Sequence, residues 1–308
     1  MKRKFKLAGW LFLGMILFVT CKEEYPLPTA SFTYAVTGNT VTFYAQVAND
    51  SKYEWNFGDG SYINTIHSPV HSFASYGTDY NVTLTIIGPG GNTSVTGKVS
   101  IPSKTKMQLL TGGSAGSTSS KKWRLSSSAP SFLITAATAN FQPVVTDYPG
   151  SILGAVGLSA VYTDEYVFKA DGTLTINPKG GGIFAGYVYC LATGTPIVTN
   201  KDAAGAGLAY LKTFVTPPGA TFAINEGKTL TLSTTLDGKT ASNTSYPGVT
   251  TLSFIKGGFL GIKDFVSECI VTQLSDTKMV AICFVSTVSS GLVGTPNMAL
   301  TLTFEVAP

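Results

Sequence analysis

Hydrophobic and polar residues alternate along much of the first third of the chain. In residues 30–34, 40–45, 53–57, 80–87 and 94–101, apolar side chains recur at every second position. This period is typical of strands that bury one face. Turns such as Gly58-Asp59-Gly60 separate the runs, because glycine adopts the positive φ angles that tight turns need. Many short strands within residues 29–103 predict an immunoglobulin-like β-sandwich.

The alternation continues through residues 121–308 and predicts a larger antiparallel β-sandwich of jelly-roll type. The strongest hairpin signal is at 165–176, where two alternating runs flank Asp171-Gly172, a pair that favours primed turns. Further hairpins are predicted at 221–235 around Glu226-Gly227 and at 269–285 around the turn 275–278, and 298–304 is predicted to be a closing strand. No segment predicts an amphipathic helix, so the expected fold class is all-β.

Glycine-rich segments divide this part of the chain. Residues 104–120 contain many glycines and serines and are predicted to be a linker. The glycine-rich segments 179–186 and 203–207 are predicted to be loops that shape a binding face.

Composition and charge narrow the function. Charged residues are only 12% of the chain, while glycine is abundant, which favours strands and turns over helices. The net charge is +4, but four of the 21 basic residues lie within the first six positions. Without them, 17 basic residues balance 17 acidic ones, so no basic patch indicates nucleic-acid binding.

The first 21 residues have the features of an export segment. A basic start precedes an apolar run from Leu7 to Val19 and then Cys21. The run is shorter than the roughly 20 residues of a membrane-spanning helix and fits a signal peptide. Phe18-Val19-Thr20-Cys21 resembles a bacterial lipobox, although Phe18 and Thr20 depart from the usual residues. The resemblance implies that Cys21 is lipidated. Lys22-Glu23-Glu24 resembles the acidic tag of lipoproteins on the outer face of the outer membrane.

Three motifs within residues 29–103 resemble the PKD domain family. They are 55–60 (WNFGDG), 69–73 (PVHSF) and 77–84 (GTDYNVTL), in this order. The resemblance implies a β-sandwich that acts as a spacer or contacts proteins and glycans without catalysis.

The chain's two histidines, His67 and His71, lie in the same part of the sequence, near Asp59. A metal site needs three or four converging ligands, and the spacing indicates no such set. We therefore expect a structural hydrogen bond for His71, a turn cap for Asp59, and neither a metal nor a cofactor.

The larger sandwich contains no histidine, which excludes Ser-His-Asp and Cys-His nucleophiles there. Glycoside hydrolysis needs only two carboxylates across a groove. Asp164 and Glu165 are adjacent, and neighbours on a strand face opposite sides, so they cannot flank one bond. An enzyme is not expected, although hydrolysis by other carboxylates stays an alternative.

Carbohydrate binding stacks aromatic rings on sugars and adds a few polar contacts. Trp123 lies beside Lys122 and Arg124, and Tyr148 and Tyr246 each precede Pro-Gly, which predicts turns. We take Trp123, Tyr148 and Tyr246 as the candidate ligand-binding residues. For Trp123, we put burial in the core slightly ahead of ligand binding, since large aromatic side chains are mostly buried.

Three cysteines remain beyond Cys21. Cys269 and Cys283 lie on the two arms of one predicted hairpin and could be joined in an oxidising compartment. Buried free thiols are the alternative, because the register of the hairpin decides whether they face each other.

The whole organisation resembles the surface glycan-binding lipoproteins of bacterial polysaccharide-uptake systems. It implies a signal peptide (1–20), a tether (21–28), a PKD domain (29–103), a linker (104–120) and a carbohydrate-binding sandwich (121–308). The expected partners are a polysaccharide or oligosaccharide, the outer membrane through the lipid on Cys21, and an outer-membrane transporter or other surface proteins. The alternative is a structural or adhesive surface protein that contacts other proteins.

Overall fold

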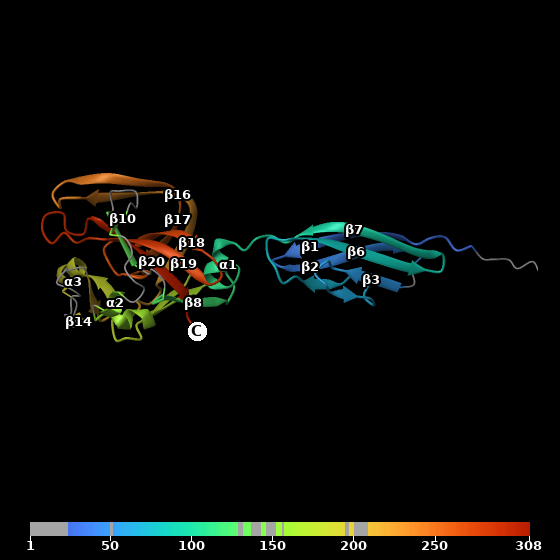
Figure 1. Cartoon of the computed structure of the whole chain (residues 1–308), viewed down its shortest axis with the longest axis horizontal. Coiled ribbons are helices and arrows are strands. Elements are labelled where there is room, and N and C mark those ends of the chain that lie inside the picture. Colours follow the sequence, from blue (N-terminus) through green and yellow to red (C-terminus); the bar gives the residue numbers. More distant parts are fainter. Residues whose placement is uncertain are drawn as a thin grey trace, which may run out of the picture. The chain divides into compact units, whose positions relative to one another are not determined.

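The computed structural model describes residues 24–49, 52–128, 132–136, 143–145, 152–155, 157–194, 197–199 and 209–308. The chain divides into two compact units after Ser103, and Figure 1 labels many of their elements. Most of the described secondary structure is strand, so the predicted all-β fold class is confirmed. None of the helices in these residues is long and apolar enough to cross a membrane.

The first unit is a sandwich of two antiparallel sheets. One sheet has the strand order β1-β2-β5 and the other the order β4-β3-β6-β7. The strands are β1 (Thr29–Thr37), β2 (Thr40–Ala48), β3 (Lys52–Asn56), β4 (Tyr62–Ile63), β5 (Val70–Ser72), β6 (Asp79–Gly88) and β7 (Gly91–Ser100).

The core of this unit follows the predicted period of two. Phe43 on β2, Trp55 on β3 and Leu84 on β6 are completely buried, whereas Tyr44 and Glu54 beside them are exposed. The Phe43 and Trp55 rings pack with centroids 5.1 Å apart. Burying alternate apolar side chains between two sheets is the main stabilisation of such a sandwich.

The turn after β3 depends on glycine. Gly58 has a φ of +77°, and a Cβ atom there would lie 2.6 Å from the carbonyl oxygen of Asn81. Both the positive φ and the close approach exclude a side chain at this position.

The described end of the predicted tether packs on the first unit. At Gly90, in the turn between β6 and β7, a Cβ atom would lie 2.3 Å from the carbonyl oxygen of Tyr25. Pro28 is buried. This part of the segment is therefore held against the first unit.

The second unit is built on a large antiparallel sheet in the order β12-β11-β8-β20-β19-β18-β17-β16, with β9 beside β20 and β10 beside β9. A smaller sheet has the order β13-β15-β14. The strands of the large sheet are β8 (Ser120–Leu125), β9 (Phe132–Ala136), β10 (Pro143–Val145), β11 (Glu165–Lys169), β12 (Leu174–Asn177), β16 (Thr221–Thr235), β17 (Ala241–Ile255), β18 (Glu268–Leu274), β19 (Lys278–Val285) and β20 (Met298–Val306). The other elements are α1 (Lys106–Thr111), α2 (Ile152–Ala155), the 3₁₀ helix η1 (Ser159–Thr163), β13 (Ile183–Gly186), α3 (Tyr187–Thr193), β14 (Ile197–Thr199) and β15 (Ala209–Lys212).

The large sheet curls until its two ends meet. The amide of Leu174 donates to the carbonyl of Ala220 (3.0 Å), and the amide of Phe222 donates to the carbonyl of Gly172 (2.9 Å). These bonds join the start of β12 to the start of β16. Side chains from both halves of the curled sheet form one apolar core, which includes Phe168, Phe259 and Phe304.

Two of the three predicted hairpins in this unit are confirmed. β11 pairs with β12 across Asp171-Gly172, and β18 pairs with β19 across the turn at 275–278. The strand predicted at 298–304 is also present as β20.

The hairpin predicted at 221–235 is wrong. These residues form one strand, β16, that pairs along its length with β17. Glu226 and Gly227 stand opposite one residue of β17, and Gly227 has a φ of +66°. A glycine with positive φ also suits a β-bulge, so the residue pair that predicted a turn forms a bulge within a continuous strand.

Two predicted glycine-rich loops are partly regular structure. Residues 106–111 of the predicted linker form α1, which begins at a capping box formed by Thr105 and Gln108 and buries Leu110 in the core of the second unit. Residues 183–186 form β13, whose four residues are all buried, so they cannot shape an open binding face. The segment 203–207 lies outside the described residues.

Candidate functional site

One outer face of the first unit is almost entirely polar. We call it the polar face; it belongs to the sheet β4-β3-β6-β7. Its side chains alternate with the buried ones of the core, and the strand register places them side by side. Its members are Lys52, Glu54 and Asn56 (β3), Tyr62 (β4), Asn64 just after β4, Thr83, Thr85 and Ile87 (β6), and Asn92, Ser94 and Thr96 (β7).

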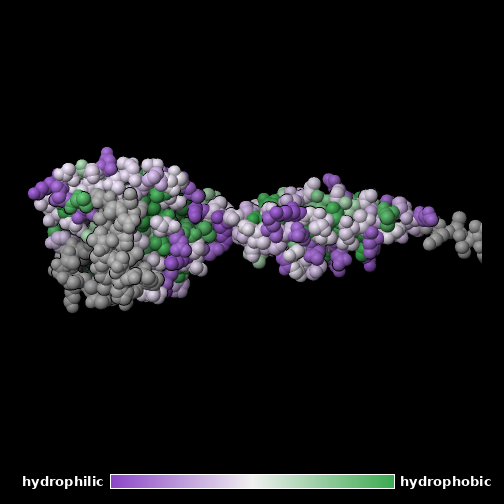
Figure 2. Space-filling model, turned by 45° about the horizontal axis from the view of Figure 1, so that its top comes forward, coloured by the Kyte–Doolittle hydropathy of each residue, from purple (hydrophilic) through white to green (hydrophobic). Residues whose placement is uncertain are grey.

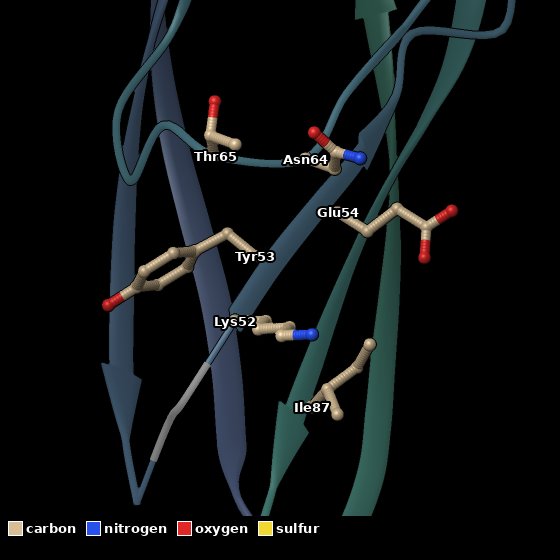
Figure 3. Close-up of a pocket in the computed structure, with 6 residues that line it drawn as sticks. All are labelled: Lys52, Tyr53, Glu54, Asn64, Thr65 and Ile87. Carbon is tan, nitrogen blue, oxygen red and sulfur yellow. The ribbon is translucent and has the colours of Figure 1, made fainter.

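A groove of about 600 Å³ opens at one end of this face. It is lined by Lys52, Tyr53, Glu54, Asn64, Thr65 and Ile87. In Figure 3 the side chains of Lys52, Glu54 and Ile87 point to one side of β3, and the Tyr53 ring points to the other. Asn64 and Thr65 lie on the segment that follows β4.

Hydrogen bonds between neighbouring strands hold several side chains of the polar face. The hydroxyls of Thr83 and Thr96 lie 2.8 Å apart, and those of Thr85 and Ser94 lie 2.9 Å apart. These pairs fix the positions of four hydroxyl groups across β6 and β7, and so preorganise part of the face.

Tyr62 adds an aromatic surface to this face. It is 62% exposed, and its hydroxyl accepts a hydrogen bond of 3.3 Å from Nδ2 of Asn56. Glu54 follows the same outward alternation as Asn56 on β3. The ring, a carboxylate and two amides are therefore available together on one sheet surface.

The polar face suits a ligand that carries many hydroxyl groups. Lys52 donates hydrogen bonds, Glu54 accepts them, and the amide of Asn64 does both. The exposed Tyr62 ring can stack on the C–H surface of a sugar. On the view in Figure 2, much of the first unit is white or purple, with several green, hydrophobic residues between.

Trp123 is not available to a ligand in this structure. It is 0% exposed and lies in the core of the second unit. Its indole Nε1 donates a 2.8 Å hydrogen bond to the carbonyl of Leu110 in α1. The expectation that Trp123 stacks on sugar is contradicted by this burial, and the alternative reading as a core residue describes its position.

Tyr246 is also buried. It was predicted to lie on a turn, but it is within β17, is 3% exposed and packs against Phe284. Pro247 and Gly248 after it form a bulge opposite Thr229, with Gly248 at a φ of +69°. The Pro-Gly pair therefore forms a β-bulge within a continuous strand and does not reverse the chain.

Tyr148 and Cys21 lie outside the described residues. Their predicted roles, in ligand binding and lipidation respectively, stay predictions.

Among the residues whose side chains the structure describes, the exposed tyrosines lie in the first unit. They are Tyr25, Tyr34, Tyr44 and Tyr62. The aromatic residues that the sequence predicted for ligand binding all lie in the second unit, and Tyr62 is not among them. The signal that could have found it is the alternation around Trp55, because Tyr62 pairs with Asn56 on the outward face.

Asp59 and His71 have the structural roles that their positions predicted. Asp59 Oδ1 accepts hydrogen bonds from the amide (3.0 Å) and the hydroxyl of Ser61, and its Oδ2 lies 2.7 Å from Nε2 of His71. Burial alone would raise the pKa of Asp59, but the hydrogen bonds from Ser61 and His71 hold it below its usual value. The His71 ring stacks on Phe57 with centroids 4.0 Å apart.

Asp164 and Glu165 face different surroundings, but only Glu165 lies on a strand: Asp164 caps the end of η1, and β11 begins at Glu165. Asp164 is completely buried, and burial raises its pKa to about 7. Glu165 pairs with Lys179 (3.4 Å) and Lys122 (3.9 Å). The two carboxyls are therefore not an acid–base pair across one groove.

A second buried carboxyl, not singled out from the sequence, is that of Asp264. Its Oδ1 accepts hydrogen bonds from the amides of Phe265 (2.8 Å) and Ser286 (3.2 Å), while burial raises its pKa to about 7. Nearby, the buried Lys212 donates to Thr193 (2.7 Å) and lies 4.4 Å from the centre of the Tyr189 ring. Lys212 therefore joins β15 to α3, and Asp264 joins the segment before β18 to Ser286, the residue after β19.

Comparison with known proteins identifies the first unit. The model of the PKD domain family matches residues 28–101. No curated protein matches the chain. Two solved structures are PKD1 domains: that of Vibrio anguillarum Epp has 23% identity and a TM-score of 0.24 and covers 26% of this chain and 98% of that chain. That of the Vibrio cholerae metalloprotease PrtV has 24% identity and a TM-score of 0.24, over 25% of this chain and 100% of that chain.

A further solved structure is of carbohydrate-binding modules from the β-sandwich superfamily that have promiscuous specificity. It has 14% identity and a TM-score of 0.25, and covers 91% of each chain. The match of the family model to residues 28–101 agrees with the three sequence motifs: the first unit is a PKD domain.

Proposed function

We propose that this protein is a surface lipoprotein that binds polysaccharide without catalysis, and that the polar face of its PKD domain contacts the glycan. The observation that carries the proposal is the combination of an exposed Tyr62 ring, ordered hydroxyl and amide groups, and a groove on one sheet surface. Sugars offer hydroxyls for the polar groups and a C–H surface for the ring.

This proposal changes the location of the binding site. The sequence placed it on the second unit, with the PKD domain as a spacer. Trp123 and Tyr246 are buried there, which leaves Tyr148 as the sequence-derived candidate on that unit. The PKD domain then contacts the glycan itself. The second unit adds a glycan contact through Tyr148 or binds other proteins of the cell surface.

Native gels that contain plant, algal or host polysaccharides test binding. The chain without residues 1–21 is run through each gel beside a protein that binds no glycan. Retardation by one class of glycan, which the free oligosaccharide of that class reverses, supports the proposal. A folded chain that migrates normally in every gel contradicts it and favours the structural or adhesive alternative.

The lipid anchor is tested separately. We propose that Cys21 is lipidated and holds the protein on the outer face of the outer membrane, where a transporter or other surface proteins take over the bound glycan. The Cys21→Ser variant should leave the membrane fraction and lose labelling by a fatty-acid probe. If wild type and variant fractionate and label identically, Cys21 is not the anchor.

A further inference from the structure

Two buried cysteines face each other across neighbouring strands of the second unit. Cys269 on β18 and Cys283 on β19 are direct partners in the strand register. They are 2% and 5% exposed and belong to the same apolar core. Both are free thiols in the structure, and the thiol of Cys283 donates to the carbonyl of Leu260 (3.3 Å).

A bulge in β18 creates this pairing. Near the turn, Leu274 stands opposite Met279 and Gln273 opposite Val280; past Thr272 the register shifts, so that Val271 stands opposite Ala281. Without the extra residue, Cys269 would stand opposite Phe284. A shift of one residue moves a side chain to the other face of the sheet, so the two thiols would then point in opposite directions.

The pairing has the dimensions of a disulfide. Directly opposed residues of antiparallel strands have Cα atoms about 4.5 or 5.5 Å apart, and disulfides join Cα atoms about 4.4–6.8 Å apart. The third described cysteine, Cys190, lies on α3 and is not paired with either strand. The fold therefore presents one specific pair of thiols.

We propose that Cys269 and Cys283 form a disulfide when the chain folds in the presence of a small-molecule disulfide. One thiolate attacks the oxidant and forms a mixed disulfide, releasing one oxidant thiol. The second thiolate attacks the sulfur of the first cysteine and displaces the other oxidant thiol. Two S–H bonds of the protein are replaced by one S–S bond, and the oxidant is reduced to two thiols.

Burial determines when the reaction takes place. The folded core excludes the oxidant from both sulfurs, so the bond forms while the β18–β19 hairpin is assembled and the rest of the sheet is still open. In the native chain the disulfide then links β18 to β19, whose outer neighbours in the sheet are β17 and β20.

Trypsin separates the two cysteines, which makes the test direct. Cleavage after Lys263 and Lys278 places Cys269 in the peptide 264–278 and Cys283 in the peptide 279–308. The full chain is unfolded with reductant, refolded with oxidised and reduced glutathione, denatured, treated with a thiol alkylator and digested without reduction. Mass spectrometry then identifies linked and alkylated peptides.

The expected result is a linked pair of peptides 264–278 and 279–308, with Cys190 alkylated in the same sample. The thermal midpoint of the second unit should rise by roughly 5–10 °C over that of the chain refolded with reductant, and this rise should be absent from the Cys283→Ser variant. Complete alkylation of Cys269 and Cys283 after the chain has refolded with glutathione, or a link from either one to Cys190, would overturn the proposal.

Discussion

At the scale of single residues, burial decides which aromatic side chains can contact a ligand. Trp123 and Tyr62 both lie on strands, but Trp123 is fully buried and its indole N–H is used within the second unit, whereas most of the Tyr62 ring is exposed. The local sequence, a tryptophan between two basic residues, is the same whether the strand buries the tryptophan side chain or exposes it. Only the packing of α1 against β8 separates the two readings.

Trp123→Ala should therefore change stability rather than glycan binding. Removing a large buried aromatic side chain costs about 3–5 kcal/mol, and the carbonyl of Leu110 also loses its donor. Chemical denaturation of the second unit measures this loss. If Trp123→Ala instead abolishes retardation by a glycan and leaves the unfolding curve unchanged, the assignment to the core is wrong.

The buried carboxyls predict a pH dependence. Asp264 has a pKa of about 7 in the folded chain against 3.8 in the unfolded chain, so the folded chain holds a proton that the unfolded chain releases. The free energy of unfolding should then fall as the pH rises from about 4 to 7. A difference of about three pKa units corresponds to roughly 4 kcal/mol.

Asp264→Asn keeps the acceptor for the amides of Phe265 and Ser286 but cannot ionise. Thermal unfolding at pH 5 and pH 8 should show a smaller difference for Asp264→Asn than for the wild type. Asp164 has a similarly raised pKa and should keep part of the dependence in this variant. Equal pH dependence in both chains would contradict the role of Asp264.

At the scale of elements, the turn residues alone do not decide whether a hairpin forms. Asp171-Gly172 joins β11 and β12 as predicted, because both arms pair without a shift. Glu226-Gly227 has a similar composition but forms a bulge. The positive φ of glycine satisfies both structures, so the choice depends on the long partner strand β17, which lies downstream in the sequence.

The helix α1 could not be predicted for a different reason. It has only six residues, too few to show a helical period, and it stands beside a glycine- and serine-rich segment. Its capping box and the burial of Leu110 stabilise it, since so short a helix is marginal by itself.

Thr105→Ala tests the capping box. The Thr105 hydroxyl accepts from the amide of Gln108 (3.2 Å), and the Gln108 side chain accepts from the amide of Thr105 (2.8 Å). Losing the cap should destabilise the second unit by about 1 kcal/mol. Hydrogen exchange of the α1 amides should accelerate by the factor that corresponds to this loss of free energy. Unchanged exchange would mean that packing alone holds the helix.

At the scale of the whole molecule, the sequence predicted the fold class and the PKD domain but not the candidate site. The PKD motifs contain residues with specific structural tasks, such as the buried Trp55 and Phe57 and the positive-φ Gly58, and so can be read from the sequence. The polar face is assembled from four strands in a particular register. Most of its members are ordinary Thr, Ser, Asn and Lys residues, which show no shared pattern until the strands are paired.

The most direct test of the central claim compares three exposed side chains of the PKD domain in gels that contain the retarding glycan. Tyr62→Ala and Glu54→Ala change the polar face, and Tyr44→Ala removes a tyrosine that is 48% exposed on the other sheet. All three should fold normally, because exposed substitutions usually change stability by less than about 0.5 kcal/mol. Tyr62→Ala and Glu54→Ala should each bind the glycan roughly tenfold more weakly, whereas Tyr44→Ala should bind it like the wild type. Equal retardation of all three variants would contradict the assignment of the glycan site to the polar face.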